Sequence, residues 1–91
     1  MVYLNNIIAI NIRVIRMKIH IEYCVKWNYG PEFDRVSKII KKLKPNSSII
    51  GNQNPPRSGA FEITINNKLI YSKFETQTFP NEDEIKNILN S

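Results

Sequence analysis

The feature that most constrains the fold is a pair of alternating segments joined by Asn66-Asn67. Residues 60–65 alternate apolar and polar side chains, which is typical of a strand with one buried face, and residues 68–73 follow as a second strand. Asparagine tolerates positive φ better than most residues, so two asparagines suit a two-residue hairpin turn. The segment therefore predicts a pair of antiparallel strands.

A strand and a helix precede this hairpin. Residues 18–23 alternate, with Ile19 and Ile21 expected to point inward. Pro31 suits the first turn of a helix, and Pro45 ends it. The apolar face of that helix is formed by Phe33, Val36, Ile39, Ile40 and Leu43.

A short strand and a second helix complete the set of elements. Residues 47–51 read as the short strand, and residues 52–59 form an irregular loop. After a polar loop, Asn81 precedes the last helix, with Glu84 in capping-box position. Ile85, Ile88 and Leu89 are expected to face inward.

The order of the elements is therefore β-α-β-β-β-α. A strand, a helix and a second strand predict a parallel crossover, and the hairpin adds antiparallel neighbours. With two helices available, one face of the sheet is covered and the other is wetter. We expect an α/β two-layer sandwich: a mixed four-stranded sheet with two helices on one face.

Composition excludes several classes of protein. The chain has 91 residues and 10.6 kDa, which is enough for one domain, and its 42% hydrophobic content is ordinary for a globular protein. No segment approaches the roughly 20 apolar residues of a membrane span. One cysteine excludes a disulfide-stapled scaffold, and one cysteine with one histidine excludes a structural zinc site. We expect a cytoplasmic domain with no cofactor, no metal and no membrane partner.

The net charge of +5 raises the question of nucleic-acid binding. Four lysines lie in the helical segment, toward its C-terminal end: Lys38, Lys41, Lys42 and Lys44. Lysines there complement the helix dipole and keep the surface solvated. Because no recognition motif or interleaved aromatic stripe accompanies them, we expect no nucleic-acid partner.

Residues 1–16 differ from the rest of the chain. Apolar residues at 8, 10, 12 and 14 are spaced by two, but the run from Ile15 onward alternates on the opposite parity. Asn11 and Arg13 interrupt the apolar segment that a signal peptide would need. A transit peptide and translation from Met17 both stay open. We treat residues 1–16 as an N-terminal extension and residues 17–91 as the domain.

Cys24 is the residue that we expect to carry chemistry. It follows the strand at 18–23 and lies a few residues before the helix that begins near Pro31. A helix N-terminus favours the thiolate, and Lys26 adds to that effect. The alternative is a small hydrophobic residue buried at a strand end, as most single cysteines are. Position alone leaves both interpretations open.

The segment 23–31, YCVKWNYGP, resembles the redox loop of the selenoprotein W-like (Rdx) family, which is thioredoxin-like. The segment 58–73, SGAFEITINNKLIYSK, is similar to that family's signature of a small residue, glycine, an aromatic residue and glutamate, then a turn and a strand ending in Ser-Lys. Phe79-Pro80 is similar to the branch that includes the migration-and-invasion-enhancer proteins. The resemblance covers about residues 17–91. It implies thiol-linked redox chemistry, with glutathione or a protein thiol as partner.

The chain departs from the family at Trp27, because the family has Cys-x-x-Sec or Cys-x-x-Cys there. With one sulfur at this site no internal disulfide can form, so Cys24 would act as a lone thiol through a mixed disulfide or a sulfenic acid. Trp27 has three interpretations: loss of the redox residue, an exposed aromatic contact for a partner, or a UGA selenocysteine codon translated as tryptophan. A UGG codon would remove the third.

Other residues complete the predicted site. Val25 and Lys26 belong to the same loop, and Ser58 and Gly59 occupy the place where thioredoxins put a proline facing the redox loop. We therefore expect Ser58 and Gly59 near the thiol. His20 is expected to be solvated or paired across the sheet.

Two functional hypotheses follow. The first is a redox protein that uses Cys24 alone or with a selenocysteine at position 27. The second is a non-catalytic interaction domain that binds through residues 25–27 or through the uncovered face of the sheet. Glu62, which recurs in the family signature, is expected to pair across the sheet rather than to act on a substrate.

Overall fold

The fold is built from four strands and three helices within residues 16–90, the part of the chain that the computed structural model describes. The strands are β1 (Lys18–Tyr23), β2 (Ser48–Ile50), β3 (Phe61–Ile65) and β4 (Lys68–Ser72). The helices are α2 (Gly30–Leu43), α3 (Lys73–Thr76) and α4 (Glu82–Leu89). The predicted order β-α-β-β-β-α is confirmed, with α3 as an added element.

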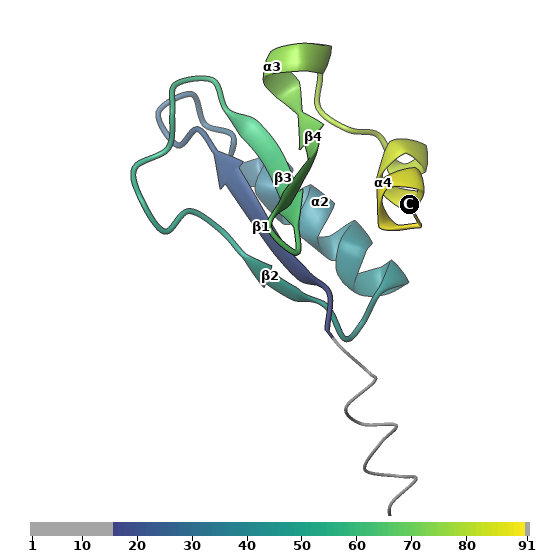
Figure 1. Cartoon of the computed structure of the whole chain (residues 1–91). Coiled ribbons are helices and arrows are strands. Elements are labelled where there is room, and N and C mark those ends of the chain that lie inside the picture. Colours follow the sequence, from purple (N-terminus) through teal and green to yellow (C-terminus); the bar gives the residue numbers. More distant parts are fainter. Residues whose placement is uncertain (1–15, 91) are drawn as a thin grey trace, which may run out of the picture.

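The four strands form one mixed sheet in the order β2-β1-β3-β4 (Figure 1). β1 runs parallel to β2, with Ile19 opposite Ile49, and antiparallel to β3, with Ile21 opposite Ile63. The parallel pair is the one that α2 connects, and the two antiparallel pairs include the hairpin β3–β4. The mixed sheet predicted from the pattern of elements is therefore confirmed.

The hairpin turn has the backbone that its two asparagines predict. Asn66 and Asn67 have φ angles of 49° and 71°, the left-handed conformation that a tight two-residue hairpin requires. The Asn66 side-chain oxygen accepts the Lys18 N–H at 3.0 Å, and the Asn66 N–H donates to the Lys18 carbonyl at 2.8 Å. The turn is thus bonded to the first residue of β1 as well.

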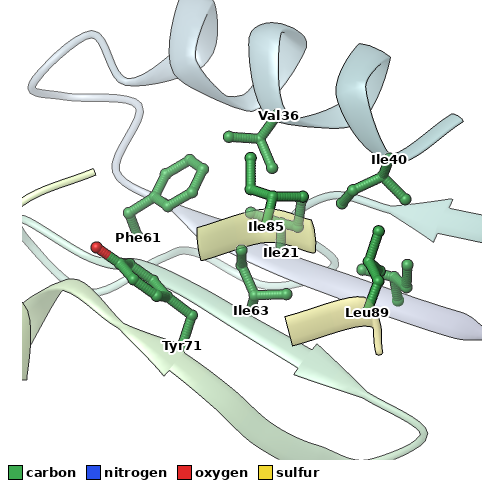
Figure 2. Packing of buried hydrophobic residues seen from close by; sticks show 9 residues of the cluster. Ile21, Val36, Ile40, Phe61, Ile63, Tyr71, Ile85 and Leu89 are labelled. Carbon is green, nitrogen blue, oxygen red and sulfur yellow. The ribbon is translucent and has the colours of Figure 1, made fainter. Parts of the chain in front are cut away.

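The core lies between the sheet and the two long helices, which cover the same face (Figure 2). Val36 and Ile40 of α2 and Ile85 and Leu89 of α4 are buried. They pack against the buried strand residues Ile19, Ile21, Phe61, Ile63 and Tyr71. Each fully buried aliphatic or aromatic side chain contributes about 1.5–3 kcal/mol, so this layer supplies most of the driving force for folding. The residues predicted to face inward on residues 18–23 and on the two long helices are buried in this core or packed against it.

The sequence predicts a strand through residue 73 and a polar loop after it, whereas Lys73–Thr76 form helix α3. It forms because its free N–H groups find acceptors: the Glu62 carboxylate accepts from Lys73 at 2.8 Å, and Ser72 Oγ accepts from Glu75 at 3.3 Å. Ser72 is a local N-cap, whereas Glu62 is more than ten residues away in the chain, so local sequence carries no sign of that second acceptor. The start of α4 is different, because Asn81 and Glu84 form the predicted capping box within one turn.

The predicted N-terminal extension, residues 1–16, lies outside the described residues except for Arg16. Between residues 16 and 90, no helix is long and apolar enough to cross a membrane.

Candidate functional site

The turn between β1 and α2 carries the predicted site. It is closed by two backbone hydrogen bonds: the Asn28 N–H donates to the Val25 carbonyl at 2.9 Å, and the Tyr29 N–H donates to the Cys24 carbonyl at 3.0 Å. Asn28 has φ 62°, a conformation that asparagine adopts more readily than most residues. Four residues therefore reverse the chain between the end of β1 and the start of α2.

Cys24 is buried at the base of this turn, with 1% of its surface exposed. Its backbone N–H donates to the Ala60 carbonyl at 2.9 Å, just before β3 begins. This bond holds Ala60, directly after Ser58 and Gly59, against the base of the turn. Cys24 is a free cysteine.

Trp27 lies on the outside of the same turn and is 55% exposed. Its indole rests on Gly59: a Cβ added at Gly59 would stand 2.9 Å from Trp27 Cζ3, closer than real Cβ contacts come. Gly59 also has φ 76°, so both its backbone and its contact with the indole require glycine. The edge of the indole faces the Tyr29 ring, with centroids 6.2 Å apart.

An open hollow of about 400 Å³ lies beside the indole. It is lined by Trp27, Ser58, Gly59, Lys73, Phe74 and Gln77. Val25, Lys26 and Ser58 are exposed, whereas Gly59 is buried. The structure therefore brings Trp27, Ser58 and Gly59 together around one hollow, and it places Cys24 outside the lining of that hollow. We call this hollow, lined by the six residues from Trp27 to Gln77 listed above, the Trp27 hollow.

The cations around the Trp27 hollow are held by aromatic rings and by a carboxylate. Lys73 Nζ stands 5.3 Å from the centroids of both Tyr29 and Phe79. Arg57 lies over the Phe74 ring at 5.0 Å and donates from Nη2 to Glu22 Oε1 at 2.8 Å. Hydrogen bonding from Arg57 lowers the pKa of Glu22 against the opposing effect of burial.

Glu62 has a different role from the one predicted. It lies opposite Glu22 in the sheet, so pairing across the sheet would join two carboxylates. Glu62 is instead 4% exposed and accepts the backbone N–H groups of Lys73 and Phe74 at 2.8 and 3.3 Å. The expected cross-strand pair is wrong, because the start of α3 supplies the nearer donors.

Asn52 is a residue that sequence reasoning missed. Its side chain accepts the Tyr23 N–H at 2.9 Å and donates to the Tyr23 carbonyl at 2.8 Å. It thus takes the place of a strand partner beyond the end of β2, directly before Cys24. The only local signal is that an amide can satisfy one donor and one acceptor at the same time.

Within residues 16–90 no group of three or more His, Cys, Asp or Glu side chains is placed to hold a metal ion.

Comparison with known proteins identifies the family of this site. The model of the Rdx family matches residues 18–91, which include the turn, the Trp27 hollow and all the elements described above. The chain belongs to the Rdx family. Membership in the Rdx family supports a redox-related, thioredoxin-like protein.

Relatives with curated names agree with this assignment. The chain is 31% identical to Selenoprotein W of Danio rerio over 68 residues, which cover 74% of this chain and 79% of that protein. It is 30% identical to Migration and invasion enhancer 1 of Bos taurus over 69 residues, 76% of this chain and 58% of the relative's length.

Solved structures support the fold class. A Selenoprotein W-related protein from Vibrio cholerae superposes with a TM-score of 0.74 at 21% identity, over 84% of this chain and 95% of that one. A protein from Bordetella parapertussis superposes with a TM-score of 0.73 at 15% identity, over 84% and 96%. The predicted thioredoxin-like two-layer fold is confirmed.

Proposed function

We propose that this Rdx protein is a thiol-linked redox protein of the cytoplasm, with Cys24 as its sulfur centre and glutathione or a protein thiol as its partner. One observation supports this most: the single thiol lies at the end of β1, bonded through its backbone to the segment after Gly59. Thioredoxins place the segment that faces their redox loop at the same point of the chain. Ser58 and Gly59 would then contact the bound partner.

The reaction is a thiol–disulfide exchange. The Cys24 thiolate attacks one sulfur of a disulfide, forms a mixed disulfide with it, and releases the other sulfur as a thiolate. Because Trp27 supplies no second sulfur, an external thiol such as glutathione attacks the mixed disulfide and restores Cys24. The external thiol leaves as a new disulfide with the sulfur that Cys24 held, and a second external thiol reduces that disulfide, so the two external thiols together supply the two electrons that reduce the original disulfide.

Burial of Cys24 makes this exchange depend on opening of the turn. A thiol with 1% exposure meets a disulfide only when residues 25–28 move away from it. We therefore propose that glutathionylation is slow in the native protein and speeds up when the turn is loosened.

The experiment is intact-mass analysis after incubation with oxidised glutathione. The expected result is the addition of one glutathione to the native protein, reversed by excess reduced glutathione, and no addition to Cys24→Ser. A Thr64→Ser variant, altered on another part of the sheet, serves as the matched control and should react like the parent. Full modification of the urea-unfolded chain with none of the folded chain would overturn the proposal.

Position 27 offers a stronger form of the same proposal. The residue there is 55% exposed, whereas Cys24 is buried, so a selenocysteine at 27 would meet the substrate first and Cys24 would resolve the intermediate. Sequencing codon 27 and measuring selenium in protein isolated from its source test this form. A UGG codon overturns it and leaves Cys24 as a lone thiol.

A second function is favoured by the exposed side chains around the site. Val25, Trp27 and Phe74 are exposed while the thiol is buried, which suits a non-catalytic interaction domain. If the protein is such a domain, Trp27→Ala would abolish its function in the cell and Cys24→Ser would leave that function intact. If it is a redox protein, Cys24→Ser would abolish the function and Trp27→Ala would leave it intact.

A further inference from the structure

A second hollow lies on the face of the sheet opposite the helices. It has a volume of about 580 Å³, and its lining includes Arg16, Lys18, His20, Ser48, Asn54 and Thr64. We call these residues, together with Ile50, which also lines it, the open-face hollow. None of them belongs to the Trp27 hollow.

The sheet register explains how this hollow is built. His20 lies on β1 between Ile50 of β2 and Thr64 of β3, and these three residues form one row across the sheet. The neighbouring row places Lys18 beside Ser48. Gln53 and Asn54, in the loop that follows β2, also line the hollow beside these rows. The result is a floor with one exposed apolar side chain, Ile50, surrounded by polar groups.

The charges around this hollow have one sign. Arg16 and Lys18 are exposed, and among the described residues no acidic side chain lines the hollow. Within residues 16–90 the salt bridges join Arg35 to Glu32 and Arg57 to Glu22, so neither Arg16 nor Lys18 is paired with a carboxylate of this region.

The acidic residue of the adjoining hollow is bound to a cation. Glu22 lines a smaller adjoining hollow that shares His20 with the open-face hollow. Its carboxylate is bound by the guanidinium of Arg57 at 2.8 Å and by the Arg57 backbone N–H at 2.8 Å. The charges of Arg16 and Lys18 therefore have no carboxylate partner within residues 16–90 and are available to bind a ligand.

We infer that the open-face hollow binds a small organic phosphate monoester. Two permanent cations match the two negative charges of a phosphate monoester, and arginine binds phosphate oxygens in a bidentate manner. The hydroxyl groups of Ser48 and Thr64 and the amide of Asn54 supply further donors. The organic group lies against the exposed side chain of Ile50. The volume is within the range of roughly 300–1,000 Å³ that small-molecule sites occupy.

The test is a titration of the full-length ¹⁵N-labelled protein, followed by amide chemical shifts at pH 7.5 and low salt. The probes are phenyl phosphate, inorganic phosphate and benzyl alcohol, which carry the head group with an organic group, the head group alone and the organic group alone. We expect saturable shifts with phenyl phosphate in residues 18–20, 48–50 and 53–54. Inorganic phosphate should bind about tenfold more weakly, and benzyl alcohol should give no saturable shift.

Charge variants decide whether the hollow itself is responsible. Lys18→Glu should weaken phenyl phosphate about tenfold, and Lys18→Gln, which keeps a polar side chain on the strand, about threefold. Lys38→Glu makes the same charge change on the exposed side of α2 and should leave the affinity unchanged. Equal weakening by Lys38→Glu, equal affinity for inorganic phosphate, or shifts centred on residues 24–28 would each overturn the inference. None of these outcomes depends on the redox state of Cys24.

Discussion

The Trp27 hollow and the open-face hollow use their cations in opposite ways. At the Trp27 hollow, Lys73 is placed over two aromatic rings, and the neighbouring Arg57 is bound to Glu22 and stacked on Phe74. At the open-face hollow, Arg16 and Lys18 meet no carboxylate of the described residues. The first set of charges is part of the framework that holds the turn and α3, whereas the second is available to a ligand. Substitutions in the two hollows should therefore differ in what they change.

The largest effect is expected at Gly59, in the Trp27 hollow. Gly59→Ala places a Cβ 2.9 Å from the indole and forces alanine to φ 76°, so we expect a loss of about 2 kcal/mol in the free energy of unfolding. Urea denaturation followed by tryptophan fluorescence measures it. Gly30→Ala is the matched control, because nothing lies within 4 Å of a Cβ there, and it should be neutral or slightly stabilising. Equal stability of the two variants would show that the contact of Trp27 with Gly59 is loose.

The next largest effect is expected at Glu62. Glu62→Ala leaves the Lys73 and Phe74 N–H groups without their acceptor and should cost about 2 kcal/mol, with faster hydrogen exchange of both amides. Urea denaturation measures the loss of stability, and hydrogen-exchange NMR measures the exchange rates of the two amides. Glu75→Ala, an exposed substitution on the same helix, should stay within about 0.5 kcal/mol of the parent. If α3 keeps its protection in Glu62→Ala, the carboxylate is not its cap.

A smaller, pH-dependent effect is expected at Arg57. Because Arg57 lowers the pKa of Glu22 in the folded state, the pair stabilises the protein above the unfolded pKa of about 4.3, and this stabilisation is lost as the pH falls through the folded pKa. Arg57 is mostly exposed, so the contribution is expected to be about 0.5–1 kcal/mol. Arg57→Gln should lower stability at pH 7 and leave stability at pH 2 unchanged, as measured by thermal unfolding. A loss of the same size at both pH values would assign the role of Arg57 to packing on Phe74.

The smallest effect on stability is expected in the open-face hollow. Lys18→Gln should change the free energy of unfolding by less than about 0.5 kcal/mol, because no salt bridge within residues 16–90 involves the ammonium group. Chemical denaturation alongside the phosphate titration checks this. A loss above about 1 kcal/mol would place Lys18 in the framework and remove the contrast between the two hollows.

The elements that could be predicted are those whose signals lie within a few residues. The Asn66-Asn67 turn, the capping box at Asn81 and Glu84, and the start of α2 near Pro31 all depend on neighbouring residues. The inward faces of the strands and helices could be predicted as well, because alternation and helical spacing are properties of the sequence.

The exposure of the candidate site residues could not be predicted from the sequence. Sequence alone places Cys24 and Trp27 on one turn and predicts that Ser58 and Gly59 lie near it. That the indole is outside and the thiol inside depends on the bond from Cys24 to Ala60 and on the contact of Trp27 with Gly59, both across more than thirty residues of chain. Helix α3 was missed partly for the same reason, since one of its acceptors, Glu62, belongs to another element, whereas the other, Ser72, is local.

By itself, then, the sequence determined the order of strands and helices and the buried faces, because local backbone preferences and side-chain periodicity act over short distances. Tertiary structure alone decided which charges are neutralised, which thiol or ring meets solvent, and where hollows form. Those properties depend on pairs such as Glu22 with Arg57 and Tyr23 with Asn52, which only the folded chain brings within hydrogen-bonding distance.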